Sequence, residues 1–149
     1  MIQEGKIVLF AFPQTDQTSG KLRPALLLRR CPGTHGDCLI CMISSQLRHE
    51  ITGLDEIVRP SDDDFARSGL KMTSVIRATR LAVVSPDVLQ GTIGTLSGAR
   101  LHRLHRNIAD WVRGSKTGPD LSPIDRVEHP AGSERRLALR SFSRDVRER

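Results

Sequence analysis

The segment Lys21-Leu22-Arg23-Pro24-Ala25-Leu26-Leu27-Leu28 decides the fold, because it changes from polar to apolar within a few residues. Pro24 has no backbone N–H to offer a neighbouring strand and favours an extended backbone at Arg23, so the pair belongs where a strand begins. The apolar run predicts a buried strand from Pro24 to Arg30. Arg23 would lie at its mouth, where a guanidinium can donate two parallel hydrogen bonds to a phosphate or carboxylate. An ordinary surface or salt-bridging arginine is the alternative.

Short strands separated by turn-forming residues are expected on both sides of this segment. Residues 6–12 are rich in β-branched and aromatic side chains and stop at Pro13, which predicts a first strand. Apolar runs predict further strands at 37–43 and 53–60, and one or two strands over 73–84. The chain is therefore predicted to be mainly β.

Two helices are predicted among these strands. Asp62–Asp64 come after Ser61, and capping by Ser61 with an acidic first turn explains this run better than metal binding does. A longer helix is expected from Ser97, because apolar residues recur there at spacings of three and four: Leu101, Leu104, Ile108, Trp111 and Val112. His102 and His105 could share a face as metal ligands, but the arginines around them favour a solvated basic face.

Polar side chains adjoin the ends of two predicted strands. A loop leads into Lys21, and Ser44-Ser45-Gln46 come directly after an apolar strand. Hydroxyl, amide and ammonium groups can hydrogen-bond phosphate oxygens and base edges. With Arg23 and Ser44 at the centre, the residues predicted to bind around them are Gln14, Thr15, Thr18, Lys21, Ser45 and Gln46. The alternatives are an exposed hairpin connection for the loop and plain strand termination for the serines.

Composition favours an anionic partner. The 149 residues carry a net charge of +6, from 23 Lys and Arg against 17 Asp and Glu. With no Tyr, one Trp and four Phe, the chain lacks the aromatic platform on which many proteins stack bases, so base contacts are expected from polar loops. The length suits one domain with an appendage.

No apolar run is long enough to span a membrane and the N-terminus lacks a secretory signal, so a cytoplasmic protein is expected. Cys31, Cys38 and Cys41 are an odd number and do not suggest a disulfide framework. If residues 37–43 form a strand, Cys38 and Cys41 point to opposite faces and cannot share a metal. We expect buried, inert thiols, with no metal site and no cofactor.

The composition changes after Gly114. Residues 115–120 resemble a linker, and prolines and a glycine interrupt the sequence beyond them. Two parts are therefore predicted: a domain over residues 1–114, and a linker and basic tail over residues 115–149 that is disordered or partly helical. Within that tail, residues 135–149 could form a transient helix, as a loose end or as a partner-binding segment.

A series of short motifs in fixed order covers roughly residues 3–113: Gly5-Lys6-Ile7-Val8, Phe12-Pro13, Lys21-x-Arg23-Pro24-Ala25-Leu26-Leu27-Leu28, Ile43-Ser44-Ser45-Gln46, Ser74-Val75-Ile76 and Ile93-Gly94-Thr95-Leu96. Together they resemble the MazF/PemK family of bacterial toxins. The resemblance implies a small SH3-like β-barrel of the CcdB/PemK type with a C-terminal helix, usually as a homodimer. It also implies a metal-independent, sequence-selective endoribonuclease that cuts single-stranded messenger RNA and is held inactive by a cognate antitoxin.

Carried over by motif, Arg23 matches the catalytic arginine of that family and Ser44 matches its hydroxyl residue, which is more often threonine. Attack of a ribose 2′-oxygen on the adjacent phosphorus builds negative charge that a guanidinium and a hydroxyl can stabilise. The expected products carry 2′,3′-cyclic phosphate and 5′-hydroxyl ends. Arginine is a poor general base, because its pKa exceeds about 12, so the base stays unassigned.

Two other functions are compatible with the sequence. One is a non-catalytic RNA-binding module with the same SH3-like fold. The other is inhibition of DNA gyrase by protein contact, as in the CcdB type, which depends on a tryptophan close to its chain end. Trp111 lies 38 residues before the terminus, and the Arg23–Ser44 pair favours RNA cleavage.

Overall fold

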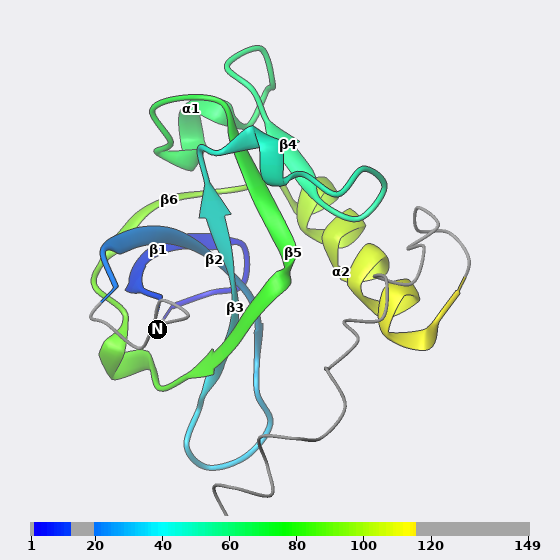
Figure 1. Ribbon diagram of the computed structural model, residues 1–149. Coiled ribbons are helices and arrows are strands. Elements are labelled where there is room, and N and C mark those ends of the chain that lie inside the picture. The colour runs from blue at the N-terminus through cyan, green and yellow to red at the C-terminus, as the bar shows by residue number, and fades with distance from the viewer. Residues whose placement is uncertain (1, 13–19, 116–149) are drawn as a thin grey trace, which may run out of the picture.

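The computed structural model describes residues 2–12 and 20–115 (Figure 1). Its elements are β1 (Lys6–Ala11), β2 (Leu22–Arg30), β3 (Cys38–Ser44), the 3-10 helix η1 (Leu47–His49), β4 (Glu56–Val58), α1 (Phe65–Ser68), β5 (Ser74–Val84), the 3-10 helix η2 (Pro86–Val88), β6 (Thr92–Thr95) and α2 (Gly98–Arg113). None of the helices described is long and apolar enough to cross a membrane.

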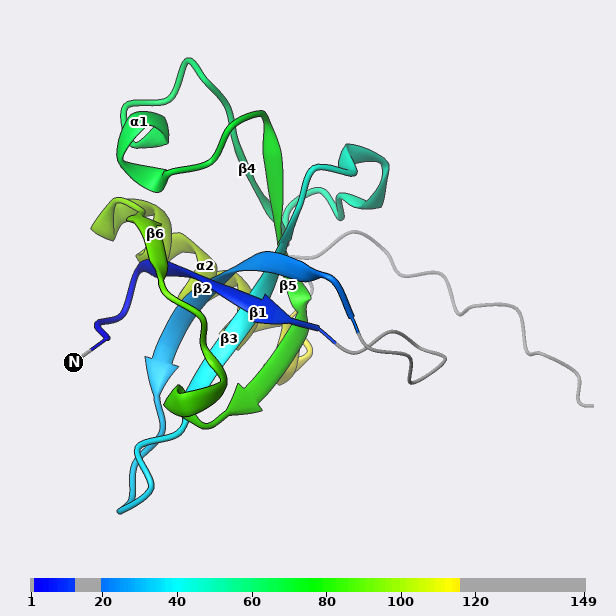
Figure 2. The same ribbon diagram turned by 90° about the vertical axis from the view of Figure 1, so that its left-hand side faces the viewer.

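The strands form one antiparallel sheet in the order β4-β5-β3-β2-β1-β6. The sheet curls into a half-barrel, and α2 lies along its outside (Figures 1 and 2). This confirms the predicted mainly β fold with a C-terminal helix. In the described part the barrel stays open, with β4 and β6 as its edge strands.

Apolar side chains fill both faces of the sheet. On the helix side, the core contains Ile7, Leu26, Leu28, Cys41, Ile43, Val58, Leu70, Ile76, Leu96 and Leu104. On the other side it contains Val8, Phe12, Ala25, Leu27, Cys38, Ile40 and Met42. Burial on both faces explains why residues 25–28 are continuously apolar rather than alternating with polar residues.

The cysteines of the Cys38-x-x-Cys41 pattern lie in different cores, as the strand prediction required. Cys38 belongs to the core away from the helix and Cys41 to the helix-side core. Burial raises the pKa of both thiols above the ordinary value of 9.0. Both are therefore protonated and poorly nucleophilic at neutral pH. Among the described residues, no group of three or more His, Cys, Asp or Glu side chains could hold a metal ion.

The acidic run before α1 differs from its prediction. Helix α1 begins at Phe65 rather than near Ser61, and its N-cap residue, Asp64, makes no capping hydrogen bond with its side chain. Asp62 and Asp64 instead bind the buried guanidinium of Arg100 in α2. The predicted capping role is wrong, because a buried cation far away in the sequence competes for these carboxylates.

Arg100 uses every nitrogen of its guanidinium. Its Nε and Nη2 donate to the Asp64 carboxylate, both at 3.0 Å, and Nη2 also donates to Asp62 at 2.9 Å. Its Nη1 donates to Glu56 at 3.1 Å and to the Ile57 carbonyl at 2.8 Å. These bonds fix the first turn of α2 to β4 and to the segment between β4 and α1.

Helix α2 confirms the helix predicted from Ser97, whose Oγ accepts the Arg100 N–H at 3.3 Å. Its apolar stripe is buried only in part. Leu104 is fully buried, whereas Trp111 is 40% and Val112 is 70% exposed. The Nε2 atom of His105 lies 2.7 Å from the Leu28 carbonyl, so this ring is partly buried rather than on a solvated face.

Candidate active site

Several strands begin or end together at one edge of the sheet, which we call the site end. The β2–β3 ladder runs as far as the pair of Ala25 with Met42, and the same register continued by two residues places Arg23 opposite Ser44. On the other side of β2, Arg23 pairs with Phe10 of β1. Residues directly opposite in an antiparallel pair share one face of the sheet. Continued in this way, two residues beyond the last pair of the ladder, the register would set the two predicted central residues side by side on one face.

Arg23 and Ser44 differ in exposure. Arg23 is exposed at the mouth of β2, whereas Ser44 is only 7% exposed at the end of β3. The Ser44 Oγ accepts the Gln46 backbone N–H at 3.1 Å. Because this contact occupies an acceptor position of the oxygen, the hydroxyl hydrogen stays available to donate toward an anion.

Three of the predicted binding residues can be placed beside this pair. Lys21 is exposed immediately before β2, and Ser45 and Gln46 are exposed immediately after Ser44. The β2–β3 register brings both segments to the site end. Gln14, Thr15 and Thr18 lie outside the described residues.

The loop between β1 and β2 begins and ends at one point. A Cβ built on Gly20 would lie 1.7 Å from the carbonyl oxygen of Phe12, so the two backbones touch there and only glycine fits. The chain therefore leaves β1 and returns to β2 beside Arg23, which lies three residues after Gly20.

Arg77 of β5 is a further candidate, which was not predicted. Ser44 pairs with Val75, and Ile76 belongs to the helix-side core, so regular alternation continued by one residue would put Arg77 on the face of Ser44. Its Nε atom is buried, and among the described residues it has no hydrogen-bond partner. Buried guanidinium N–H groups almost always have an acceptor, so this atom suits an oxyanion. The only signal for it in the sequence is that a charged residue, Arg77, lies between the apolar residues Ile76 and Ala78 of a predicted strand.

A sheet irregularity lies next to Arg77. Between the pairs Cys41–Leu81 and Ile43–Ile76, β3 supplies one residue, Met42, while β5 supplies four, residues 77–80. Such a bulge interrupts the ladder and redirects side chains. Arg77 is the first residue of the bulge.

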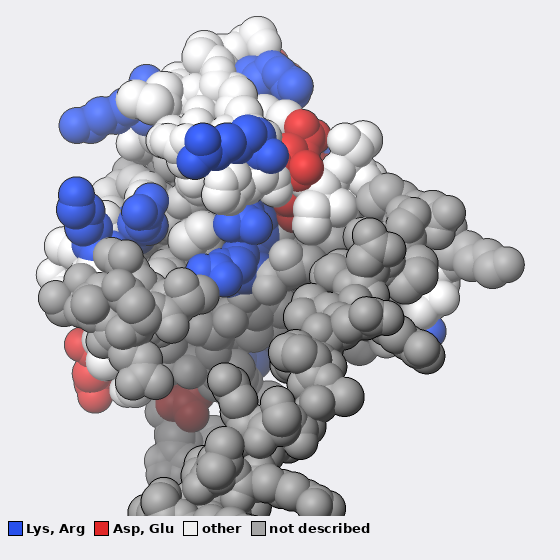
Figure 3. All heavy atoms as spheres, viewed as in Figure 1, with Lys and Arg blue, Asp and Glu red and all other residues white. Residues whose placement is uncertain are grey.

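Basic side chains surround this arrangement. On the face seen in Figure 3, Lys and Arg gather over the upper half of the molecule, which is the site end. The exposed basic residues on the strand ends and loops of this region are Lys21, Arg23, Arg48, Arg59 and Lys71. The site therefore attracts a polyanion electrostatically.

Two apolar side chains are also exposed at the site end. Leu47 of η1 is 40% exposed, and Met72, two residues before β5, is 57% exposed. Apolar side chains can contact the faces of unpaired bases. They add aliphatic surface to the polar loops from which base contacts were predicted.

The fold defines a class of protein: a small β half-barrel with a C-terminal helix, here with exposed basic side chains at the site end. A family model described as the PemK-like, MazF-like toxin of type II toxin–antitoxin systems matches residues 3–112. The chain therefore belongs to this toxin family, as the motif resemblance indicated. No curated protein sequence matches the chain.

Solved structures support the same fold. An endoribonuclease in complex with its cognate antitoxin, from a mycobacterial species, is 13% identical with a TM-score of 0.54, over 76% of this chain and 96% of that chain. The Mycobacterium tuberculosis toxin MazF-mt6 is 22% identical with a TM-score of 0.52, over 72% and 97%. A further mycobacterial endoribonuclease is 13% identical with a TM-score of 0.52, over 74% and 91%.

Proposed function

We propose that this chain is the toxin of a toxin–antitoxin pair and cleaves single-stranded messenger RNA in the cytoplasm without a metal ion. The observation that supports the proposal is the β2–β3 ladder, whose register, continued two residues past its last pair of Ala25 with Met42, would set Arg23 opposite Ser44. Arg77 with its unpartnered Nε would lie on the same face. In this proposal, the two arginines and the Ser44 hydroxyl act together at the site end, where a phosphodiester can approach from the basic surface.

The chemistry uses these groups directly. The ribose 2′-hydroxyl gives up its proton as its oxygen bonds to phosphorus, the bond from phosphorus to the 5′-oxygen breaks, and the leaving 5′-oxygen takes up a proton. The products are a 2′,3′-cyclic phosphate and a 5′-hydroxyl. Negative charge develops on the non-bridging oxygens, where Arg23, Arg77 and the Ser44 hydroxyl can stabilise it. Because a guanidinium gives up a proton very reluctantly, either arginine serves as a clamp or as a proton donor to the leaving 5′-oxygen rather than as the base.

The test is incubation of the purified protein with a mixed RNA pool in EDTA, with subsequent mapping of both fragment ends. We expect cleavage at one short sequence, with cyclic phosphate on the upstream fragments. RNA that stays intact under chelation and is cut once magnesium is added would overturn metal independence. RNA that is bound but not cut in either condition would favour the non-catalytic module.

Two partners complete the proposal. One similar structure is an endoribonuclease in complex with its cognate antitoxin, and we infer that this chain also pairs with an antitoxin. We also infer a homodimer, because the exposed Trp111 and Val112 leave apolar surface at the end of α2. Light scattering at micromolar concentration tests the dimer, and a clean monomer that still cleaves RNA would contradict it.

A further inference from the structure

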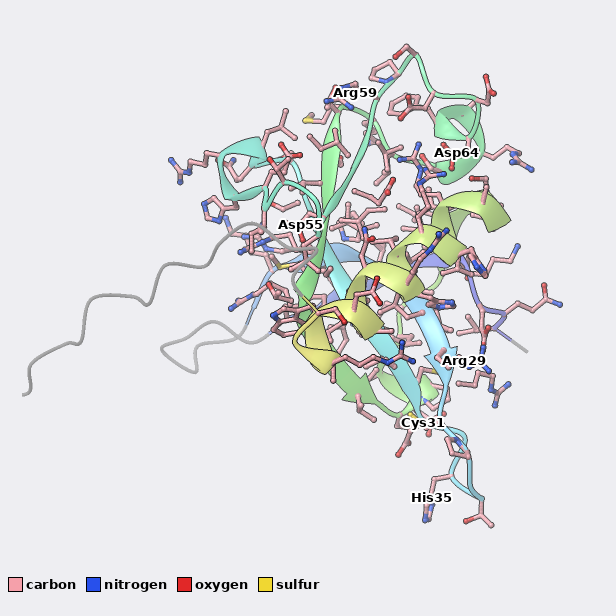
Figure 4. All side chains as sticks on the ribbon, turned by 90° about the vertical axis from the view of Figure 1, so that its right-hand side faces the viewer. Arg29, Cys31, His35, Asp55, Arg59 and Asp64 are labelled. Atoms are coloured by element: carbon pink, nitrogen blue, oxygen red, sulfur yellow. The ribbon has the colours of Figure 1, made fainter. Side chains whose placement is uncertain are left out.

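A buried carboxylate joins two segments that border the active site. Asp55 precedes β4 and is 8% exposed. Its Oδ1 accepts the Ala78 backbone N–H at 2.8 Å, and its Oδ2 accepts the Ile51 backbone N–H at 2.9 Å. Figure 4 shows Asp55 away from the hairpin that carries Cys31 and His35.

The first of these bonds lies within the β5 bulge. Ala78 is the residue after Arg77, in the stretch where β5 supplies four residues against Met42 alone. A bulge leaves backbone groups outside the ladder, and a buried N–H without an acceptor is costly. Asp55 supplies that acceptor, so its carboxylate holds the bulge in one conformation.

The second bond lies in the loop between β3 and β4. The backbone N–H groups of Leu54 and Asp55 both donate to the Ile51 carbonyl, at 3.1 and 2.9 Å. With the Asp55 carboxylate on the Ile51 N–H, residues 51–55 form a closed turn. This turn completes the loop that begins with Ser45 and Gln46 directly after Ser44. One side chain therefore fixes both the Arg77 segment and the Ser44 segment.

The sheet register supports the same connection. The β4–β5 pairs are Val58 with Ser74, Ile57 with Val75 and Glu56 with Ile76. One further step in this register places Asp55 opposite Arg77. The hydrogen bond from the Ala78 N–H to Asp55 therefore holds the β5 backbone next to Arg77, whose Nε has no partner among the described residues.

We propose that Asp55 is a positioning residue for cleavage, whose carboxylate aligns Arg77 with Ser44 by holding the β5 bulge against the β3–β4 loop. This inference rests on the proposed function. It assigns Asp55 no contact with RNA. A small displacement of a catalytic group can cost a large factor in rate, which makes the effect of Asp55 measurable.

The experiment compares Asp55→Asn with Asp64→Asn. Both residues are buried aspartates with several hydrogen bonds, but Asp64 binds Arg100 and has no contact with the bulge. The rates are compared at a temperature at which urea denaturation shows that every variant is folded. Under this condition, Asp55→Asn should lower kcat by roughly ten- to a hundredfold with KM nearly unchanged. Asp64→Asn should lower stability and leave kcat within about twofold of wild type.

A double-mutant cycle separates a positioning role from a purely structural one, because a purely structural role would not couple the rate effects of the two substitutions. If Asp55 acts through Arg77, then Arg77→Ala combined with Asp55→Asn should cut no more slowly than Arg77→Ala alone. Arg77→Ala combined with Asp64→Asn should show the product of the two single effects. If Asp55→Asn does not fold, Asp55→Glu replaces it in the cycle, because it keeps both acceptor oxygens on a longer side chain.

The outcomes separate this inference from the function on which it rests. A wild-type protein that cuts no RNA defeats the proposed function. If the wild-type protein cuts RNA but the rate losses of Asp55→Asn and Arg77→Ala multiply in the double variant, only the positioning role is wrong. A kcat loss in Asp64→Asn equal to that in Asp55→Asn also defeats it, because general loosening would then explain both.

Discussion

Arg23 and Ser44, at the site ends of the neighbouring strands β2 and β3, differ in exposure, and we propose different tasks for them. Ser44 is buried, and the Gln46 N–H holds its oxygen, so its hydroxyl keeps a constant place. Arg23 is exposed to solvent near the start of β2. Under the proposed function, the buried group would supply a fixed donor, while the exposed group would bind the phosphate and stabilise its growing charge.

Arg23→Ala should lower kcat/KM for RNA cleavage by on the order of a hundredfold, because a charged donor to the transition state is lost. The matched control is Arg29→Ala, on the same strand but at its far end, where the side chain is 68% exposed and lies 3.6 Å from the Glu4 carboxylate. Initial rates on a short RNA containing the mapped sequence decide the comparison. An Arg23→Ala protein that cuts within a few-fold of wild type removes Arg23 from the mechanism.

Some of the proposed site residues could be predicted from the sequence, and others could not, for a physical reason. Arg23 stands out because it precedes a proline at a strand mouth, and Ser44 because it ends an apolar run. Arg77 and Asp55 do not stand out. Their roles depend on a bulge, which is a mismatch between strands far apart in the sequence, and local patterns carry no record of such a mismatch.

At the scale of elements, the first turn of α2 is held by charge as well as by apolar packing. Arg100 is 7% exposed and bridges Asp62, Asp64 and Glu56. Periodicity predicts the helix correctly, but local pattern wrongly assigns the acidic run to a cap. Capping is a local rule, whereas the attraction of a buried cation acts between residues 36 positions apart.

Arg100→Ala should lower the free energy of unfolding by about 3–5 kcal/mol, because it leaves buried carboxylates without their cation. The control, Arg103→Ala, lies one turn later and also binds Glu56, but its side chain is 48% exposed. Its loss should cost less than about 1 kcal/mol. Urea denaturation at neutral pH measures both, and equal losses would show that the Arg100 network is not specially stabilising.

The same network predicts how stability responds to acid. Hydrogen bonds from Arg100 hold the pKa of Asp64 well below its ordinary value of 3.8, although burial opposes them. The unfolded chain therefore binds a proton at Asp64 more readily than the folded chain does. The stabilisation that Asp64 contributes is complete above its ordinary pKa and is lost as the pH falls below that value. Urea midpoints between about pH 5 and pH 2.5 should therefore fall steeply in wild type.

Asp64→Asn should flatten that acid dependence, because it removes the group whose pKa is shifted. Asp63→Asn, at the adjacent exposed position, is the control and should keep the wild-type slope. If both variants titrate like wild type, Asp64 does not contribute to the acid sensitivity.

At the scale of the whole molecule, the mainly β fold class can be predicted from the sequence, but the pairing of distant strands that curls the sheet cannot. Successive strands β1, β2 and β3 pair as neighbours, as short turns between apolar runs suggest. The pairing of β6 with β1 joins Lys6 to Thr95 and depends on the curl of the entire sheet. That curl depends on the bulges and on packing against α2, which only the assembled chain defines.

A chain that ends at Gly114 should fold with nearly the wild-type urea midpoint and should cut the same RNA sequence. It keeps every described element, and the helix cap at Gly114 remains. The removed residues 115–149 hold eight basic and six acidic side chains, so RNA binding should weaken slightly, with a shallower salt dependence. Loss of folding, or a changed cleavage sequence, would mean that residues 135–149 dock on the domain.

The contact between Gly20 and Phe12 has a consequence for how such a toxin evolves. Because the chain leaves and re-enters the sheet at one point, the loop between them can be exchanged, or lengthened at a cost of only about 0.6 kcal/mol per doubling, while the paired strands keep their register. Under the proposed function, in which this loop contacts RNA, a lineage can acquire new target sequences by changing the loop, provided that position 20 remains glycine.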